Sequence, residues 1–253
     1  KAQRKDRQYP AASAEKLPAI LGAMDEALKL DCGKADELRR MAELISEHRL
    51  SHEMLPSEAK NHAAIWEALL PSMGSEALLR NLNKLAQLGM TPPLGAGTAE
   101  ICRRFEDGEA LRKDRLHPMR ILVGMRQYAT GHGDQGGLSW TPNEQIVRAL
   151  DGAFYLAFKQ AEPTGKRYML GLDISGSMSS AIQTPGRGGK PGRSLPISFR
   201  EAAACMAMVV ARSEKQWAAY GFSKDLVPLQ GFGTSRIDQM DSYLNQWSYN
   251  FGS

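Results

Sequence analysis

The sequence predicts a series of stacked amphipathic helices followed by the first half of an α/β domain of the doubly wound, Rossmann-like kind. Apolar residues recur at helical spacing from about residue 15 to residue 159. Turn-forming residues interrupt this pattern at positions 162–165, and the period then changes to that of a short apolar strand. A helix and a second strand follow. We therefore place a domain boundary near Pro163, with residues 1–162 helical and residues 163–253 α/β.

The composition favours a folded protein of the cytosol. Of the 253 residues, 42% are hydrophobic and 24% are charged, which is the globular range. Cys32, Cys102 and Cys205 are odd in number and far apart, so we expect reduced thiols and no disulfide framework or zinc cluster. No apolar run reaches the roughly 18 residues of a membrane helix. The net charge of +4 permits a polyanionic partner without requiring one.

Four apolar stripes define the expected core of the helical region. Their members are Leu17, Ile20, Leu21, Met24 and Leu28; Leu38, Met41, Ala42 and Ile45; Ile65, Trp66, Leu69 and Leu70; and Leu78, Leu79, Leu82, Leu85 and Leu88. Helices of this kind bury their stripes by stacking on one another, as in helical-repeat solenoids. A helical bundle is the alternative, because no strict repeat period is visible.

The last helix of the series has the strongest start signal. Thr141 and Glu144 form a capping box, and Pro142 stands at the first helical position. We expect this helix to extend from Pro142 to about Lys159.

The α/β region opens with an apolar strand at residues 167–173, of the kind buried in parallel sheets. A helix should begin at Ser198, with Glu201 in the reciprocal capping position, and a second strand should lie near residues 217–222. Between them, residues 185–193 are basic and rich in glycine. Thr184 and Pro191 depart from the phosphate-loop pattern, so we interpret this stretch as a mobile insertion; an RNA-contacting loop is the alternative.

Asp173, Ser175 and Ser177 form the pattern D-x-S-x-S at the carboxyl end of the first strand. Alternate residues of an extended segment point the same way, so one carboxylate and two hydroxyls should converge. Such oxygen ligands suit Mg²⁺ best, and also Mn²⁺ or Ca²⁺. The pattern resembles the metal-ion-dependent adhesion site of von Willebrand factor A domains. The alternative is a serine-rich turn whose aspartate caps the next helix.

Catalysis by these serines is disfavoured by their surroundings. Neither serine lies in a G-x-S-x-G elbow, and no histidine or lysine is near in sequence to activate a hydroxyl. The five histidines all lie in the helical region.

Several stretches resemble the Ro autoantigen family, also called TROVE-domain proteins. They are His117-Pro118, Arg126-Gln127-Tyr128, Thr130-Gly131-His132-Gly133, Trp140-Thr141-Pro142, Ala149-Leu150-Asp151, Ala153-Phe154-Tyr155 and Glu162-Pro163-Thr164-Gly165-Lys166-Arg167 leading into Asp173. Others are Glu47-His48-Arg49-Leu50, Leu78-Leu79-Arg80-Asn81-Leu82 and Met206-Ala207-Met208-Val209-Val210. The similarity begins near Glu37, and residues 1–30 match only weakly.

The resemblance implies a monomeric ring of HEAT-type helical repeats, closed by a von Willebrand factor A domain. Such proteins bind small noncoding Y RNAs on the outer ring surface and single-stranded ends of misfolded RNAs in the central hole. They act in noncoding RNA quality control, with exoribonucleases as partners in bacteria, and are not known as enzymes. A bacterial or phage member is expected.

Basic side chains of the helical region are the candidates for RNA contact. Arg80 and Lys84 share one helix face and can grip neighbouring phosphates, while His117, Arg120 and Arg126 lie on another helix. For each residue the alternative is an ordinary solvated surface position.

Against the family pattern, the chain is expected to be a fragment. The upstream ring helices would precede Lys1. The turn that supplies a threonine to the metal would continue beyond Phe251-Gly252-Ser253, so we expect an incomplete metal site in this chain. Three functions follow: an RNA-binding scaffold, a metal-dependent protein-adhesion module, and a hydrolase using Asp173 or a serine.

Overall fold

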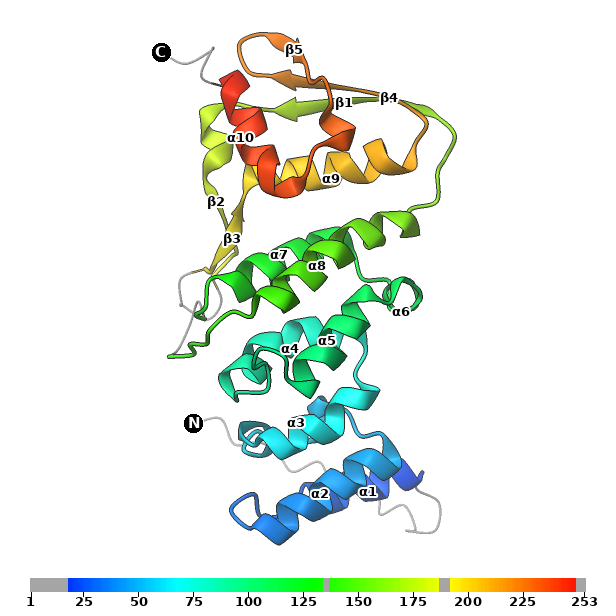
Figure 1. Ribbon diagram of the computed structural model, residues 1–253, viewed down its shortest axis with the longest axis vertical. Helices are drawn as coiled ribbons and strands as arrows, with labels where there is room; N and C mark the ends of the chain where they lie inside the picture. The colour runs from blue at the N-terminus through cyan, green and yellow to red at the C-terminus, as the bar shows by residue number, and fades with distance from the viewer. Residues whose placement is uncertain (1–17, 134–136, 187–191, 249–253) are drawn as a thin grey trace, which may run out of the picture. The chain divides into compact units, whose positions relative to one another are not determined.

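The computed structural model describes residues 18–133, 137–186 and 192–248 (Figure 1). Helices come first and strands follow, as the sequence predicts. The change from helix to strand falls between Gln160 and Arg167. By their internal contacts, the residues form two compact units, Lys1–Met73 and Gly74–Ser253. The functional division into residues 1–162 and 163–253 stays a prediction.

The first unit is entirely helical in its described part. Its α-helices are α1 (Ala19–Ala27), α2 (Ala35–His48) and α3 (Ala63–Leu69), and its short 3-10 turns are η2 (His52–Met54), η3 (Ala59–Asn61) and η4 (Leu70–Ser72). α2 packs against α3 through Met41, Ile45, Ile65 and Trp66, which are fully buried. These residues belong to two of the predicted stripes.

The predicted stripe of α1 is wrong at Leu21 and Leu28, while Ile20 and Met24 are half-buried and Leu17 lies outside the described residues. Leu21 is 39% exposed and Leu28 is 50% exposed, whereas Ala23 and Ala27 are buried. The small alanine side chains let α1 lie close to α2, so the helix turns its larger side chains away from that contact. The hydrophobicity of its residues alone does not predict which face of α1 is buried.

The helices of the second unit pack mainly on α8 (Glu144–Ala157) and α7 (Pro118–Ala129). The others before the strands are α4 (Ser75–Gln87), α5 (Ala96–Glu106) and α6 (Gly108–Lys113), and the 3-10 turn η5 (Phe158–Gln160) follows α8. α5 and α7 both pack on α8, and α4 packs on α7. The stripe of α4 is buried from Leu78 to Leu85, and Gly89 ends the segment with a positive φ of 73°.

The start of α8 differs from the predicted capping box. The helix begins at Glu144, and its cap is Asn143, whose side chain accepts a 2.9 Å hydrogen bond from the Gln145 N–H. The Asn143 amide also donates to the Thr91 carbonyl at 3.2 Å, and its backbone N–H donates to the Tyr128 hydroxyl at 3.1 Å. These tertiary partners fix Asn143 as the cap instead of the exposed Thr141.

The α/β region contains a three-stranded sheet in the order β1-β4-β5 and a separate hairpin. The strands are β1 (Arg167–Asp173), β2 (Ala181–Gln183), β3 (Ser194–Ser198), β4 (Gln216–Phe222) and β5 (Leu226–Pro228). The helical segments are η6 (Gly176–Ser179), α9 (Phe199–Ser213), η7 (Phe232–Thr234) and α10 (Ile237–Ser248). β1 and β4 are parallel, while β4 and β5 are antiparallel. Both predicted strands and the Ser198–Glu201 capping box of α9 are confirmed.

β1 is less buried than predicted. Its residues alternate between more and less exposed positions; Leu172 is buried, but Met169 is 68% exposed. α9 packs against β1 and β4, and α10 packs on α9, so these helices lie on one side of the sheet (Figure 1). No described element covers the opposite face, which leaves alternate side chains in solvent.

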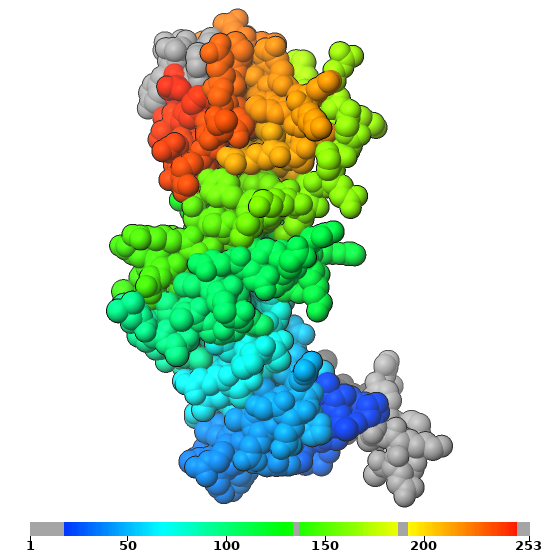
Figure 2. Space-filling view, turned by 45° about the vertical axis from the view of Figure 1, so that its right-hand side comes forward, coloured from blue at the N-terminus to red at the C-terminus, as the bar shows by residue number. Residues whose placement is uncertain are grey.

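The helical and α/β parts of the second unit are in direct contact. α7 packs against β3 and α9. Figure 2 shows the yellow-green end of the helical part touching the gold and red surface of the α/β part. The ion pair between Arg126 on α7 and Glu201 on α9, at 2.9 Å, joins the two parts. Among the described residues, no helix is both long and apolar enough to cross a membrane.

Candidate functional site

The D-x-S-x-S loop follows β1 directly, and hydrogen bonds link Asp173, Ser175 and Ser177 within it. The Asp173 Oδ1 accepts a hydrogen bond from the Ser175 N–H at 2.9 Å. The hydroxyl oxygens of Ser175 and Ser177 lie 3.1 Å apart. Asp173 and Ser175 are half-buried and Ser177 is exposed, so the group opens to solvent.

Two buried residues hold this loop in place. The Ile174 N–H donates to the Phe222 carbonyl at 3.0 Å, which extends the parallel pairing of β1 and β4 by one residue. Arg200 on α9 is 1% exposed and donates to the Ser175 carbonyl at 3.3 Å. Its guanidinium also reaches Asn245 at 3.0 Å and Asp241 at 3.6 Å, both on α10. Arg200 therefore links the loop to two helices.

The donor set of the loop suits a hard divalent cation. It consists of one carboxylate and two hydroxyls, whose oxygens Mg²⁺ accepts alongside bound waters. Among the described residues, no group of three or more histidines, cysteines, aspartates or glutamates could hold a metal, so a cation here would depend on a single carboxylate. The residues at positions 251–253, where the sequence places the start of a further ligand turn, lie outside the described residues.

The loop offers little support for a hydrolase function. The contact that the structure records for the two hydroxyls is the one between them, and no imidazole or amine is bonded to either within the described ranges. An activated nucleophile needs such a base within hydrogen-bond reach.

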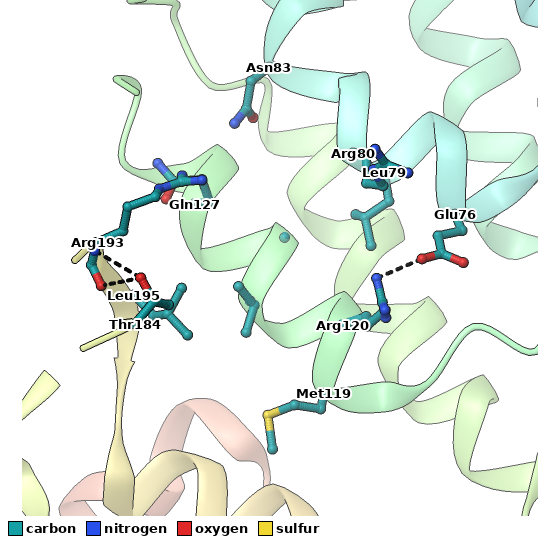
Figure 3. Close-up of a pocket in the computed structure, with 12 residues that line it drawn as sticks. Glu76, Leu79, Arg80, Asn83, Met119, Arg120, Gln127, Thr184, Arg193 and Leu195 are labelled. Carbon is teal, nitrogen blue, oxygen red and sulfur yellow. Dashed lines mark hydrogen bonds and ion pairs between the residues drawn. The ribbon is translucent and has the colours of Figure 1, made fainter. Parts of the chain in front are cut away.

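Two of the predicted RNA-binding residues, Arg80 on α4 and Arg120 on α7, line one groove. It has a volume of about 390 Å³ and is bounded by α4, α7 and the β2–β3 hairpin (Figure 3). The hairpin contributes a third arginine, Arg193, together with Thr184 and Leu195. Arg120 is paired with Glu76 at 2.6 Å.

The other three predicted RNA-binding residues lie elsewhere. The Lys84 ammonium donates to the Gln87 side chain at 3.0 Å on the surface of α4. His117 caps α7, with its Nδ1 accepting from the Met119 N–H at 3.1 Å, and lines a separate cavity with Arg112 and Arg115. Arg126 is half-buried against Glu201. The RNA-binding role of all five residues stays a prediction.

Sequence reasoning missed Asn83 and Gln127 in the groove, and Arg200 behind the loop, whereas Arg193 was covered only by the alternative interpretation of residues 185–193 as an RNA-contacting loop. Asn83 and Gln127 carry no local signal, because each lies on an ordinary amphipathic helix. Arg193 ends the basic stretch 185–193, of which residues 187–191 lie outside the described part of the chain. For Arg200 the sequence offers one signal, which is a positively charged residue in the first turn of a mostly apolar helix.

Comparisons with known proteins agree on both parts of the chain. Family models described as the TROVE domain and the Ro60 vWA domain match residues 38–127 and 167–252. The chain is 35% identical to a Caenorhabditis elegans protein named RNA-binding protein RO60, over 93% of this chain and 34% of that protein. It is 33% identical to a Deinococcus radiodurans protein of the same name, over 83% of this chain and 38% of that one.

A solved structure is also similar. The crystal structure of the Deinococcus radiodurans RO (RSR) protein matches with a TM-score of 0.76 and 28% sequence identity, over 93% of this chain and 45% of that chain. The chain thus spans about a third of the length of the curated relatives it matches.

Proposed function

Because the chain belongs to the Ro family, we propose that it is part of an RNA-binding protein whose helical region contacts the RNA. The proposal rests mainly on one observation, that the match to the TROVE domain is followed along the same chain by the match to the Ro60 vWA domain. The groove with Arg80, Arg120 and Arg193 supplies a basic surface in the second unit, and phosphate contacts need such side chains. The proposal assigns no catalytic step.

We propose further that the protein binds two kinds of RNA. One is a small noncoding Y-like RNA, and the other is the single-stranded end of a misfolded RNA, so that the protein acts as a scaffold in noncoding RNA quality control. An exoribonuclease is the corresponding protein partner. The support for these details is the family membership.

A second candidate function is metal-dependent protein adhesion by the α/β region. The specific observation is that hydrogen bonds gather Asp173, Ser175 and Ser177 in one loop that opens to solvent. These residues would hold a divalent cation, most suitably Mg²⁺, which when bound offers an open position to a carboxylate of a partner protein. Arg200 would keep the Ser175 backbone in position from behind.

RNA recovered with the protein tests the main proposal. The whole protein, purified from its own cells, should carry discrete small RNAs that nuclease treatment removes. Binding of these RNAs should weaken steeply as salt increases, because the contacts are made to phosphates. Absence of bound RNA, together with carboxylate-dependent capture of a protein only when Mg²⁺ is present, would favour the adhesion function instead.

A further inference from the structure

We propose that the groove between α4, α7 and the β2–β3 hairpin holds one unstacked nucleotide of single-stranded RNA. This inference rests on the proposed RNA-binding function and assigns it a site. The groove is hereafter the α4–α7 groove, and Figure 3 shows the residues that line it. Three properties support the assignment: an apolar floor, a basic rim and amide side chains at one end.

The floor is apolar and close to α4. Leu79 from α4, Met119 and Val123 from α7, and Leu195 from β3 form it. Gly124 lets the two helices approach, since a Cβ there would lie 2.6 Å from the Leu79 Cδ1. A volume of about 390 Å³ lies in the range of about 300–1,000 Å³ typical of small-ligand sites, near its lower end. One base with its sugar fits this scale better than a peptide segment or a duplex.

The rim carries more positive than negative charge. Arg80, Arg120 and Arg193 come from three different elements, and among the described residues that line the groove Glu76 is the one acidic side chain. The Arg120 side chain is 62% exposed although it pairs with Glu76, so part of its guanidinium still faces solvent. Arginines bind phosphate through their planar fork and can also stack on a base, which suits a nucleotide whose base leaves the strand.

The amides of Asn83 and Gln127 add groups able to recognise a base edge. Gln127 is held by hydrogen bonds from its Nε2 to the His132 carbonyl at 2.9 Å and to the Thr130 hydroxyl at 3.4 Å. These bonds leave its Oε1 as the acceptor for a base amino or imino group. Asn83 lines the same groove from α4 (Figure 3). Side chains cannot read the narrow major groove of an RNA duplex, and sequence-specific contacts are mostly made to unpaired bases, so a blunt RNA duplex should not use the groove.

Filling the groove tests the proposal. In Val123→Trp, the indole would occupy the floor without changing charge, whereas Val147→Trp places the same side chain at a similarly half-buried position of α8 outside the groove. The probes are decauridylate and a blunt RNA duplex of the same length. We expect Val123→Trp to weaken decauridylate binding about tenfold or more, since a base contact of this kind accounts for such a factor. Val147→Trp should bind as the unsubstituted chain does.

Substitution of an arginine on the rim can also be compared with a matched control variant. Arg120 and Arg103 are 62% and 63% exposed, and each pairs with a glutamate, but only Arg120 lines the groove. Arg120→Ala should lower the steepness of the log K against log salt plot by about 0.7, and Arg103→Ala should leave it unchanged. Asn83→Ala should alter the preference among oligo-U, oligo-A and oligo-C. If circular dichroism shows that Val123→Trp does not fold, Arg120→Ala and Asn83→Ala test the proposed nucleotide site in its place.

The outcomes separate the site from the function. If the unsubstituted chain binds decauridylate but folded Val123→Trp, Asn83→Ala and Arg120→Ala bind it equally well, the groove is not the nucleotide site and RNA binding stands. If Val123→Trp weakens the duplex as much as decauridylate, base insertion is wrong. If the unsubstituted chain binds neither probe but binds oligoglutamate in a manner that Val123→Trp blocks, the groove recognises an acidic peptide and both proposals fail.

Discussion

Buried polar side chains decide where single elements of this protein begin, and Asn143 is the clearest case. Its side chain caps α8 and also bonds the Thr91 carbonyl. Asn143→Ala should lower the free energy of unfolding by about 2–4 kcal/mol, because a lost cap and an unsatisfied buried group each cost about 1–2 kcal/mol. Thr141→Ala, at the exposed position that the sequence favoured, should cost less than about 0.5 kcal/mol. Urea unfolding measures both, and equal costs would contradict the assignment of the cap.

Asp173 supplies the formal charge of the candidate metal loop. Asp173→Ala should abolish divalent-cation binding there and leave RNA affinity nearly unchanged, since no RNA candidate lies in the loop. Asp173→Asn keeps an oxygen that can accept from the Ser175 N–H and should lose the metal as well. Asp225→Ala, which removes an exposed aspartate after β4, is the control. Calorimetry with Mg²⁺ or Mn²⁺ decides. Retained metal binding, or lost RNA affinity in a folded variant, would show that the two roles are assigned wrongly.

Local spacing predicted that the Ser175 and Ser177 hydroxyls lie together, but the segment is not extended throughout, because Ser177 belongs to the 3-10 turn η6. The Asp173 carboxylate accepts from the Ser175 backbone N–H, and the convergence of all three side chains stays a prediction. The ion pair of Arg126 could not be predicted from local spacing. Its partner Glu201 is 75 residues away, and only packing of α7 on α9 brings the two together. The same holds for Arg200, whose contacts lie on α10 and on the loop.

At the scale of elements, Glu214 ties the end of α9 to the turn before β1. Its carboxylate accepts from the Thr164 N–H at 2.6 Å and from the Gly165 N–H at 3.1 Å. The hydrogen bond from Thr164 lowers the pKa of Glu214 below its ordinary 4.5. A lowered pKa means that the ionised form is favoured by folding. The resulting stability is present above the unfolded-state pKa and is lost as the pH falls through the folded-state pKa.

Glu214→Gln should therefore reduce stability near neutral pH, and the deficit should shrink as the pH falls from the ordinary value of 4.5 through the lowered folded-state pKa of the unsubstituted chain. Urea midpoints across this pH range measure the effect. Glu162→Gln, at an exposed position just before the same turn, should show no comparable deficit. A deficit of constant size at every pH would mean that the charge of Glu214 is unimportant.

The elements were predictable where their signals are local. The capping box at Ser198 and the bounds of β1 follow from residues within a few positions of each other. Which face of an element is buried depends on its neighbours. The leucines of α1 and the exposed Met169 of β1 could not be placed from the sequence, because a stripe or an apolar run does not say how many elements cover it.

At the scale of the second unit, the predicted RNA-contacting cations fall into separate places. Arg80 and Arg120 meet in the α4–α7 groove, His117 lines another cavity, and Arg126 forms an ion pair between α7 and α9. A net charge of +4 does not reveal this arrangement. If RNA follows the groove, Arg80 and Lys84 on α4 should contribute to its salt dependence together with Arg120 and Arg193, while Arg126 should matter mainly for stability.

The double variant Arg80→Ala/Lys84→Ala tests this expectation. Both residues lie on α4, one in the groove and one beside it, a helical turn apart. If each neutralises one phosphate of single-stranded RNA, the steepness of the log K against log salt plot should fall by about 1.4, that is about 0.7 per contact, with little change in sequence preference. The matched control Arg103→Ala/Arg104→Ala removes the same charge from α5, outside the groove, and should leave the plot unchanged. Binding is measured at several salt concentrations after circular dichroism confirms the fold. Equal plots for the two double variants would mean that α4 contributes only general surface charge, and the RNA contacts would then have to be sought around His117, Arg120 and Arg126.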